Sequence, residues 1–361
     1  MSDSNWHALR VLEYDRIREI LVSYAVSAPG KECTRKMAPL RSPAEIRKRL
    51  AETEEMRALL KGARLPLAGL KDVTGELDQA TGQGRPGEPE LLYRVVELLR
   101  AGLTVRETLA RSPSALPELA ALGSGIEDLP ILREEIPVKI DPRGGVRDDA
   151  TEKLAGLRRE IEELRSSLRS RAGRILADPR LRAAFQAEGL TFKDDRYLLP
   201  VRAEYRSWIH GPIRDRSQSG ATLYVEPDEI AIDGDRLLDL LESERGEVQR
   251  VLWDLTRKVL ASRPALARIQ ERLAWVDFTC AKACYADAFG LSPPEINDAG
   301  VLDLREARHP YLLWLARDVK RDIRDVDLEG AQSRVVPVSL RLGDGFKILI
   351  VTGPNTGGKT V

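Results

Sequence analysis

LAGLRREIEELRSSL at residues 154–168 and LLDLLESERGEVQRVLWDL at residues 237–255 are the two stretches that decide the fold. In both, apolar residues recur at alternating intervals of three and four, which is the heptad spacing that places side chains on one seam of a helix. The first seam consists of Leu154, Leu157, Ile161, Leu164 and Leu168. The second consists of Leu237, Leu241, Glu244, Val248, Val251 and Leu255. We predict long antiparallel coiled-coil arms, with two helices of an ordinary bundle as the alternative.

The sequence between these seams changes its period. The runs YLLPVRAEY, SWIHGPI and GATLYVEP are short and rich in strand-forming residues, and turn-prone residues such as Gly211-Pro212 and Gln218-Ser219-Gly220 separate them. This pattern predicts a small β-rich module, over residues 190–230, at the tip of the arms.

The flanking sequence is mostly helical in pattern. Apolar residues fall at helical spacing over residues 5–60, where Ser42-Pro43 is a good helix start, and again from residue 91 to residue 110. Residues 62–89 are rich in Gly and Pro and are expected to be loop, and prolines break residues 111–145 into a connecting region. The fold class is therefore predicted to be mainly α.

A phosphate-binding loop follows the apolar run FKILIV, which we expect to be a buried strand at residues 346–351 of an α/β ATPase domain. The loop fits G-x-x-x-x-G-K-[ST], whose backbone N–H groups surround a β-phosphate, while its Lys reaches the β- and γ-phosphates and its Thr ligates Mg²⁺. The predicted ATP-binding residues are Gly353, Pro354, Asn355, Thr356, Gly357, Gly358, Lys359 and Thr360, with Thr360 also the magnesium ligand. The helix that should complete the site does not follow, so we expect a truncated protein that by itself binds ATP weakly and does not hydrolyse it.

Composition gives the environment of the protein. Lys+Arg and Asp+Glu both number 57 in 361 residues, so the net charge indicates no partner. The three cysteines offer no disulfide framework, and Cys280 and Cys284 are expected to be helix residues without a metal. No long apolar segment or leader is evident, which predicts a soluble, cytoplasmic protein.

The distribution of charge is more informative than its total. Residues 169–216 contain eleven basic and six acidic residues, whereas residues 221–260 contain ten acidic and five basic ones. A basic β module with interleaved aromatic residues suits contact with a phosphate backbone, while a solvated face paired with its acidic neighbour is the competing interpretation. The candidate nucleic-acid contacts of the module are Lys193, Arg196, Arg202, Arg206, Arg214 and Arg216.

Four segments together resemble bacterial MutS-type ATPases of the second type (MutS-two). They are ALRVLEYDRIREILVSYAVSAPGKE, FKDDRYLLPVRAEYRSWIHGPIRDRSQSGATLYVEP, LREARHPYL and ILIVTGPNTGGKTV. The resemblance implies a helical core or lever at residues 1–130 and 251–290, arms with a clamp at 131–250, and the start of an ATPase domain at 295–361. The chain begins at the lever, so the mismatch wedge of mismatch-repair relatives is not expected.

The resemblance also implies a function for the full-length protein. It would be a homodimeric DNA-binding ATPase that uses ATP and Mg²⁺, clamps branched or duplex DNA without sequence specificity, and suppresses homologous recombination. A small C-terminal Smr domain would make it an endonuclease. Action on collided ribosomes through ribosomal RNA is the alternative, and a scaffold that binds no nucleic acid is a third possibility.

Two further assignments come from the resemblance. Arg308-His309-Pro310 matches the segment that enters the ATPase domain, for which a structural turn is the alternative. The adenine contact would fall at Val335-Val336-Pro337, where it can only be apolar.

Overall fold

The computed structural model describes residues 3–111, 114–187, 189–317 and 328–350. These residues form two compact units. The first, here called the helical unit, draws on residues 1–78, 94–133 and 261–361, and the second, here called the arm unit, draws on residues 79–93 and 134–260.

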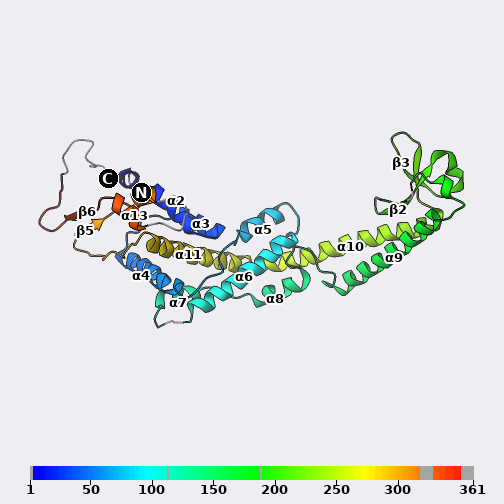
Figure 1. Ribbon diagram of the computed structural model, residues 1–361. Helices are drawn as coiled ribbons and strands as arrows, with labels where there is room; N and C mark the ends of the chain where they lie inside the picture. The colour runs from blue at the N-terminus through cyan, green and yellow to red at the C-terminus, as the bar shows by residue number, and fades with distance from the viewer. Residues whose placement is uncertain (1–2, 112–113, 188, 318–327, 351–361) are drawn as a thin grey trace. The chain divides into compact units, whose positions relative to one another are not determined.

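Helices account for most of the described chain, so the prediction of a mainly α protein is confirmed (Figure 1). Those of the first 140 residues are α1 (Asp3–Val11), α2 (Tyr14–Tyr24), α3 (Ala28–Arg35), α4 (Pro43–Leu60), α5 (Val73–Gly82), α6 (Pro89–Leu109), α7 (Pro117–Ser124) and α8 (Pro130–Lys139). Those that follow are α9 (Glu152–Leu176), α10 (Asp228–Ala261), α11 (Arg263–Ala288), α12 (Pro310–Ala316) and α13 (Leu328–Arg334). None of the described helices is both long enough and apolar enough to span a bilayer.

Serine caps and first-turn prolines begin several of these helices. The Ser42 hydroxyl accepts a hydrogen bond from the Glu45 N–H ahead of α4, which confirms the predicted Ser-Pro helix start. Ser27 caps α3 in the same way by accepting from the Gly30 N–H at 2.9 Å. Each cap satisfies one of the backbone donors that a helix leaves unpaired at its N-terminus.

Two regions that were predicted to be loop or connection contain helices. Residues 62–89 contain α5, and residues 111–145 contain α7 and α8. Pro117 and Pro130 stand at the first position of α7 and α8, where a proline lacks only a donor that has no partner in any case. Pro117 and Pro130, which looked like helix breakers, are therefore helix starts, whereas Pro137 lies inside α8.

The core of the helical unit lies on α11. Phe278, Ala281 and Tyr285 pack against Ile20 and Tyr24 of α2. The Tyr24 and Tyr285 rings meet edge to face, with 5.9 Å between their centroids. Apolar side chains of α12 and α13, among them Leu313 and Ala331, join the same cluster.

Helices α9 and α10 lie antiparallel in the arm unit (Figure 1). Their shared core is formed by Ile161, Leu168, Ala172, Ile230, Leu237 and Leu241. Arg158 of α9 pairs with Glu244 of α10 at 2.7 Å, and Arg171 pairs with Asp233, so residue numbers rise on one helix as they fall on the other. The predicted fold-back pair is present, and its description as a knobs-into-holes coiled coil stays a prediction.

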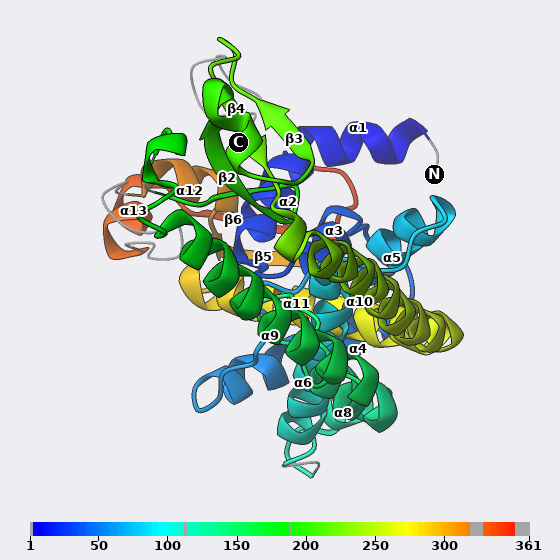
Figure 2. The same ribbon diagram turned by 90° about the vertical axis from the view of Figure 1, so that its right-hand side faces the viewer.

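A four-stranded antiparallel sheet joins the two helices, and with its short flanking helices it is here called the β module (Figure 2). The strand order is β1-β2-β4-β3, with the bounds β1 (Thr191–Lys193), β2 (Arg196–Arg202), β3 (Ile213–Arg216) and β4 (Thr222–Val225). The 3₁₀ helices η1 (Arg182–Ala184) and η2 (Ala203–Trp208) precede and interrupt it. The core consists of Phe185, Leu199, Val201, Ile209, Leu223 and Val225.

The C-terminal strands β5 (Leu302–Ala307) and β6 (Val338–Leu342) pair antiparallel with each other. The predicted strand at residues 346–351 is wrong for its described part, because residues 346–350 form no strand and Ile348 and Ile350 are 78% and 79% exposed. An apolar strand becomes buried only when other strands pair with it and helices cover its faces. Within the described residues, none pairs with this run.

Candidate nucleic-acid interface

The β module carries all six basic residues that were predicted to contact nucleic acid. Lys193 ends β1, Arg196 and Arg202 begin and end β2, and Arg206 lies in η2. Arg214 and Arg216 lie on β3. Their partners divide them into two groups.

Arg196 and Arg214 bind a carboxylate at the junction of β4 and α10. Arg196 donates to both oxygens of Glu226, at 2.8 and 2.7 Å, and Arg214 donates to Oε2 at 2.7 Å. Glu226 is 1% exposed, so its charge is stabilised by these guanidinium groups and not by water. Arg196 also pairs with Asp235 of α10 and thereby lowers the pKa of that carboxyl. The two arginines fasten the sheet to the start of α10.

Lys193 and Arg206 are likewise held within the module. Lys193 pairs with Asp215, and its ammonium lowers the pKa of that carboxyl. Arg206 donates to the backbone carbonyls of Ile209 and Gly211, which closes the turn after η2. Both cations are thus already engaged within the module, although the half-exposed Lys193 keeps further N–H donors open to solvent.

Arg202 and Arg216 differ from the other four residues. Both side chains are exposed, and neither has a hydrogen bond or ion pair in the part of the chain that the structure describes. Arg202 lies opposite Thr222 and Arg216 lies opposite Leu223. Because Thr222 and Leu223 are consecutive on β4, between β2 and β3, Arg202 and Arg216 lie at the same end of the sheet. Side chains alternate along a strand, so the register places these two on opposite faces of that end.

Aromatic residues of the β module are exposed in two places. The hairpin between β1 and β2 turns at Asp194 and Asp195, both at positive φ, as a two-residue turn requires. Beside this turn, Phe192 is 50% exposed and its ring lies 4.9 Å from that of Tyr197. Trp208, at the end of η2, is 47% exposed. Phe192 is not among the residues predicted from the sequence, although its position before the turn residues Asp194-Asp195 is a signal that could have revealed it.

The predicted ATP and magnesium residues, Gly353 to Thr360, lie outside the described residues. Closer to the described end, the Arg308 side chain donates to the Val335 carbonyl at 3.2 Å, which joins the two segments assigned to ATPase entry and adenine contact. Val335 is 7% exposed and Val336 is 82% exposed. Val336 therefore presents the most accessible apolar side chain of the three residues, and Pro337 is partly exposed.

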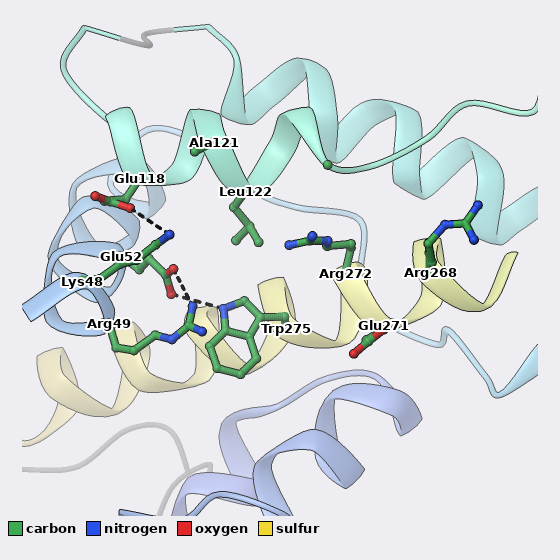
Figure 3. Close-up of a pocket in the computed structure, with 11 residues that line it drawn as sticks. Lys48, Arg49, Glu52, Glu118, Ala121, Leu122, Arg268, Glu271, Arg272 and Trp275 are labelled. Carbon is green, nitrogen blue, oxygen red and sulfur yellow. Dashed lines mark hydrogen bonds and ion pairs between the residues drawn. The ribbon is translucent and has the colours of Figure 1, made fainter. Parts of the chain in front are cut away.

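The helical unit contains a cavity of about 510 Å³ between α4, α7 and α11 (Figure 3). Four of its charged residues form two ion pairs within the lining, Lys48 with Glu118 and Arg49 with Glu52. Glu52, 2% exposed, accepts from Arg49 at 2.7 Å and from the Trp275 indole N–H at 3.2 Å. The Arg49 guanidinium also lies over the Trp275 ring, 4.1 Å from its centroid. This cluster closes on itself and holds α4 against α11, so it is a structural feature.

The cysteines form no metal-binding cluster with other side chains in the described part of the chain. Cys280 faces the Met56 sulfur at 3.6 Å, and burial raises the pKa of its thiol. Cys284, one turn later on α11, is exposed. No group of three or more His, Cys, Asp or Glu side chains able to hold a metal ion occurs among the described residues.

Three curated proteins similar to this chain share one name. The chain is 33% identical over 357 residues to a protein named Endonuclease MutS2 from Shouchella clausii and 33% identical over 355 residues to one of that name from Pelotomaculum thermopropionicum. A third, from Geobacillus thermodenitrificans, is 32% identical over 357 residues. No protein-family model matches the chain.

These alignments cover 98% of this chain, from the helical unit through the β module. Over nearly its whole length, the chain is therefore similar to proteins named MutS2. It spans 43% of the length of the curated relatives, so what their name says of them describes proteins more than twice as long.

Proposed function

We propose that this chain is the DNA-gripping part of a MutS2-type DNA-binding ATPase, with the β module as its clamp. The observation that carries the proposal is the pair Arg202 and Arg216, which are exposed at one end of the sheet. The module fixes its other four candidate cations internally, and this leaves a rigid sheet that presents two available guanidinium groups. Rigid presentation lowers the entropic cost of binding a phosphate backbone.

The proposed clamp contacts the backbone and does not recognise base sequence. Guanidinium groups bind phosphate oxygens well, and such contacts position a protein without conveying sequence. Gln218 is the only Asn or Gln in residues 190–230, and these are the residue types that recognise adenine edges. Branched and ordinary duplex DNA are therefore both suitable ligands, in agreement with the resemblance.

The remaining functions belong to the longer protein and are proposals for it. The loop Gly353–Thr360 would bind ATP, with Lys359 on the phosphates and Thr360 on Mg²⁺. Nucleotide-dependent opening of the arms in a homodimer would regulate the grip on DNA and so suppress recombination. The relatives are named endonucleases, and we propose the same activity for the full-length protein through an Smr domain.

Fluorescence anisotropy on duplex and four-way-junction DNA, at two salt concentrations, tests the clamp. Replacing both Arg202 and Arg216 by Ala should weaken binding of both DNAs about 10-fold or more and reduce the slope of log K against log salt by about 2, because two phosphate contacts are lost. The matched control replaces Arg245 and Arg257, which are 74% and 68% exposed on α10. Equal weakening by the two double variants would show a general charge effect and refute the assigned site.

A competition arm separates DNA from the ribosomal alternative. If DNA is the ligand, excess duplex should displace the labelled junction while ribosomal RNA of equal nucleotide concentration competes less well. Stronger competition by the RNA would replace DNA with RNA as the proposed partner.

A further inference from the structure

Trp208 projects from the β module in a way that its fold does not require. It ends η2 and leaves 47% of its surface exposed. The Tyr205 ring contacts it edge-on, with 4.9 Å between centroids and an interplanar angle of 65°. Aromatic rings of this size are normally buried to a larger extent because of the apolar area they carry. An indole supported by a second ring and open to solvent is suited to bind a flat ligand.

The turn that holds Trp208 is fixed on both sides. Arg206 donates to the carbonyls of Ile209 and Gly211, so the chain around the indole is cross-linked. Ile209, the next residue, is 4% exposed and belongs to the core of the module. The indole is therefore presented by a rigid support, and little conformational entropy is lost when a ligand stacks on it.

A nucleic-acid base is the flat group that fits this position. Arg202 begins the same turn, and its exposed guanidinium has no partner within the described ranges, so it is available to the phosphate of a nucleotide stacked nearby. Proteins that bind single strands combine such aromatic faces with basic residues that follow the backbone. Inside a duplex both faces of each base are covered by its neighbours, so a protruding indole stacks on an unpaired base without the unstacking cost that a paired one imposes.

We propose that Trp208 stacks on an unpaired base and makes the β module prefer single-stranded segments of nucleic acid over blunt duplex. This inference rests on the proposed clamp function. It adds a second kind of contact: Arg202 and Arg216 bind backbone in any nucleic acid, whereas Trp208 acts only where a base is free. Trp208 is thus a specificity residue for the structure of the nucleic acid and does not select a base sequence.

The chain offers a closely matched control in Phe192. Its exposure, 50%, equals that of Trp208 within a few per cent, and its ring lies at the same 4.9 Å from a tyrosine ring. It differs in location, because it lies on β1 beside the hairpin turn and not in the turn that Arg202 begins. Replacement of Phe192 therefore removes an equally exposed aromatic ring without removing the proposed stacking residue.

The experiment measures anisotropy of the 361-residue chain with a labelled single-stranded oligothymidine and with a blunt duplex of equal length. Trp208→Ala should weaken single-strand binding about 10-fold and change duplex binding less than twofold, since one stacked base is lost. Trp208→Phe, which keeps a ring, should recover most of the affinity, and Phe192→Ala should resemble the wild type. A 2-aminopurine base in the single strand should be quenched by the wild type and by Trp208→Phe but not by Trp208→Ala.

The outcomes separate this inference from the proposed function. If the wild type binds both nucleic acids and Trp208→Ala changes neither, the stacking inference is wrong and the clamp stands. Equal weakening on duplex and single strand would assign Trp208 to backbone or groove contact and also overturn the inference. A change in sedimentation of Trp208→Ala without a change in binding would make the indole a contact between copies of the chain. No binding by the wild type would refute the clamp itself.

Discussion

The Thr151 hydroxyl donates a hydrogen bond to Glu247 Oε1 at 2.9 Å, across 96 residues of sequence. Thr151 is also the N-cap of α9, where its oxygen accepts from the Leu154 N–H at 3.0 Å. Glu247, on α10, is 2% exposed and receives the Arg250 guanidinium at 3.0 Å. The Glu247 carboxylate thus fixes the N-terminus of α9 against α10. The β module follows the other end of α9.

Acid should weaken this junction in a defined pH range. The Arg250 guanidinium lowers the pKa of Glu247 from 4.5 to about 2. A carboxyl whose pKa is lower in the folded state stabilises the fold above the pKa of the unfolded chain, and that stabilisation is lost as protons bind. At pH 7 we expect the free energy of unfolding in urea to be about 1–3 kcal/mol higher for the wild type than for Glu247→Gln, because the substitution weakens the buried contacts of Glu247 with Thr151 and Arg250.

The difference between wild type and Glu247→Gln should shrink as pH falls from about 4.5 toward 2 and should be constant between pH 6 and 8, because the carboxyl is ionised there in both states. Unfolding at five pH values measures it. Glu242→Gln, an exposed position on the same helix, is the control and should show a small, pH-independent effect. A wild-type advantage that persisted unchanged at pH 2 would refute the role of the charge.

The helix pair and its insert could be predicted because their signals are local. The heptad seams identify the buried faces of α9 and α10, of which Leu168 and Leu237 are buried in the shared core, and the change of period identifies the β module. The predicted strand at residues 346–351 failed because burial of a strand depends on neighbours that its own sequence does not specify. Local pattern reveals which face is apolar, but not what covers it.

The positive charge of the candidate site could be predicted from the sequence, but the carboxylates that its basic residues bind could not. The excess of basic residues identified the β module, whereas Arg196 meets Glu226 and Asp235 at separations of 30 and 39 residues. Such partners are brought together by the sheet register and by the junction with α10. A single sequence therefore does not reveal that Arg196 is held in the fold while Arg202 is left exposed.

Gly234 should tolerate alanine poorly, contrary to the usual preference of helices. Ala normally stabilises a helix interior by up to about 1 kcal/mol relative to Gly. A Cβ on Gly234 of α10 would lie 2.3 Å from Glu226 Oε1, which two arginines hold in place. We expect Gly234→Ala to destabilise the arm unit by about 1–3 kcal/mol through overpacking.

Gly246 provides the control on the same helix, because a Cβ there meets nothing within 4 Å. Gly246→Ala should therefore raise the unfolding free energy by about 0.5–1 kcal/mol. If Glu226 is fixed as described, thermal or urea unfolding should show changes in unfolding free energy of opposite sign for the two variants, negative for Gly234→Ala and positive for Gly246→Ala. Stabilisation by both would show that the Glu226 network moves aside at little cost.

The two cysteines of α11 should react with thiol reagents at very different rates. Cys284 is exposed, whereas Cys280 is partly buried beside Met56, and burial raises the pKa of its thiol. Only the thiolate reacts, so at pH 8 Cys284 should be modified at least tenfold faster. Timed alkylation followed by peptide mass spectrometry measures both rates, and denatured protein, in which the two should react alike, is the control. Similar rates in the folded protein would contradict the packing of α11.

Gly30 should be intolerant of any side chain because of Asp277. The Asp277 carboxylate is fully buried on α11 and accepts from the Ser27 N–H at 2.8 Å and from the Ser27 hydroxyl at 2.5 Å. A Cβ on Gly30 would lie 2.0 Å from Asp277 Oδ2, so Gly30→Ala must displace a carboxylate that has no solvent to enter, and we expect a loss of about 3 kcal/mol or more in urea unfolding. Gly62→Ala, where a Cβ meets nothing within 4 Å, should change stability by less than about 1 kcal/mol. In a double-mutant cycle, Gly30→Ala with Asp277→Ala should cost clearly less than the sum of the two single changes, because the clash is gone, and strict additivity would disprove the contact.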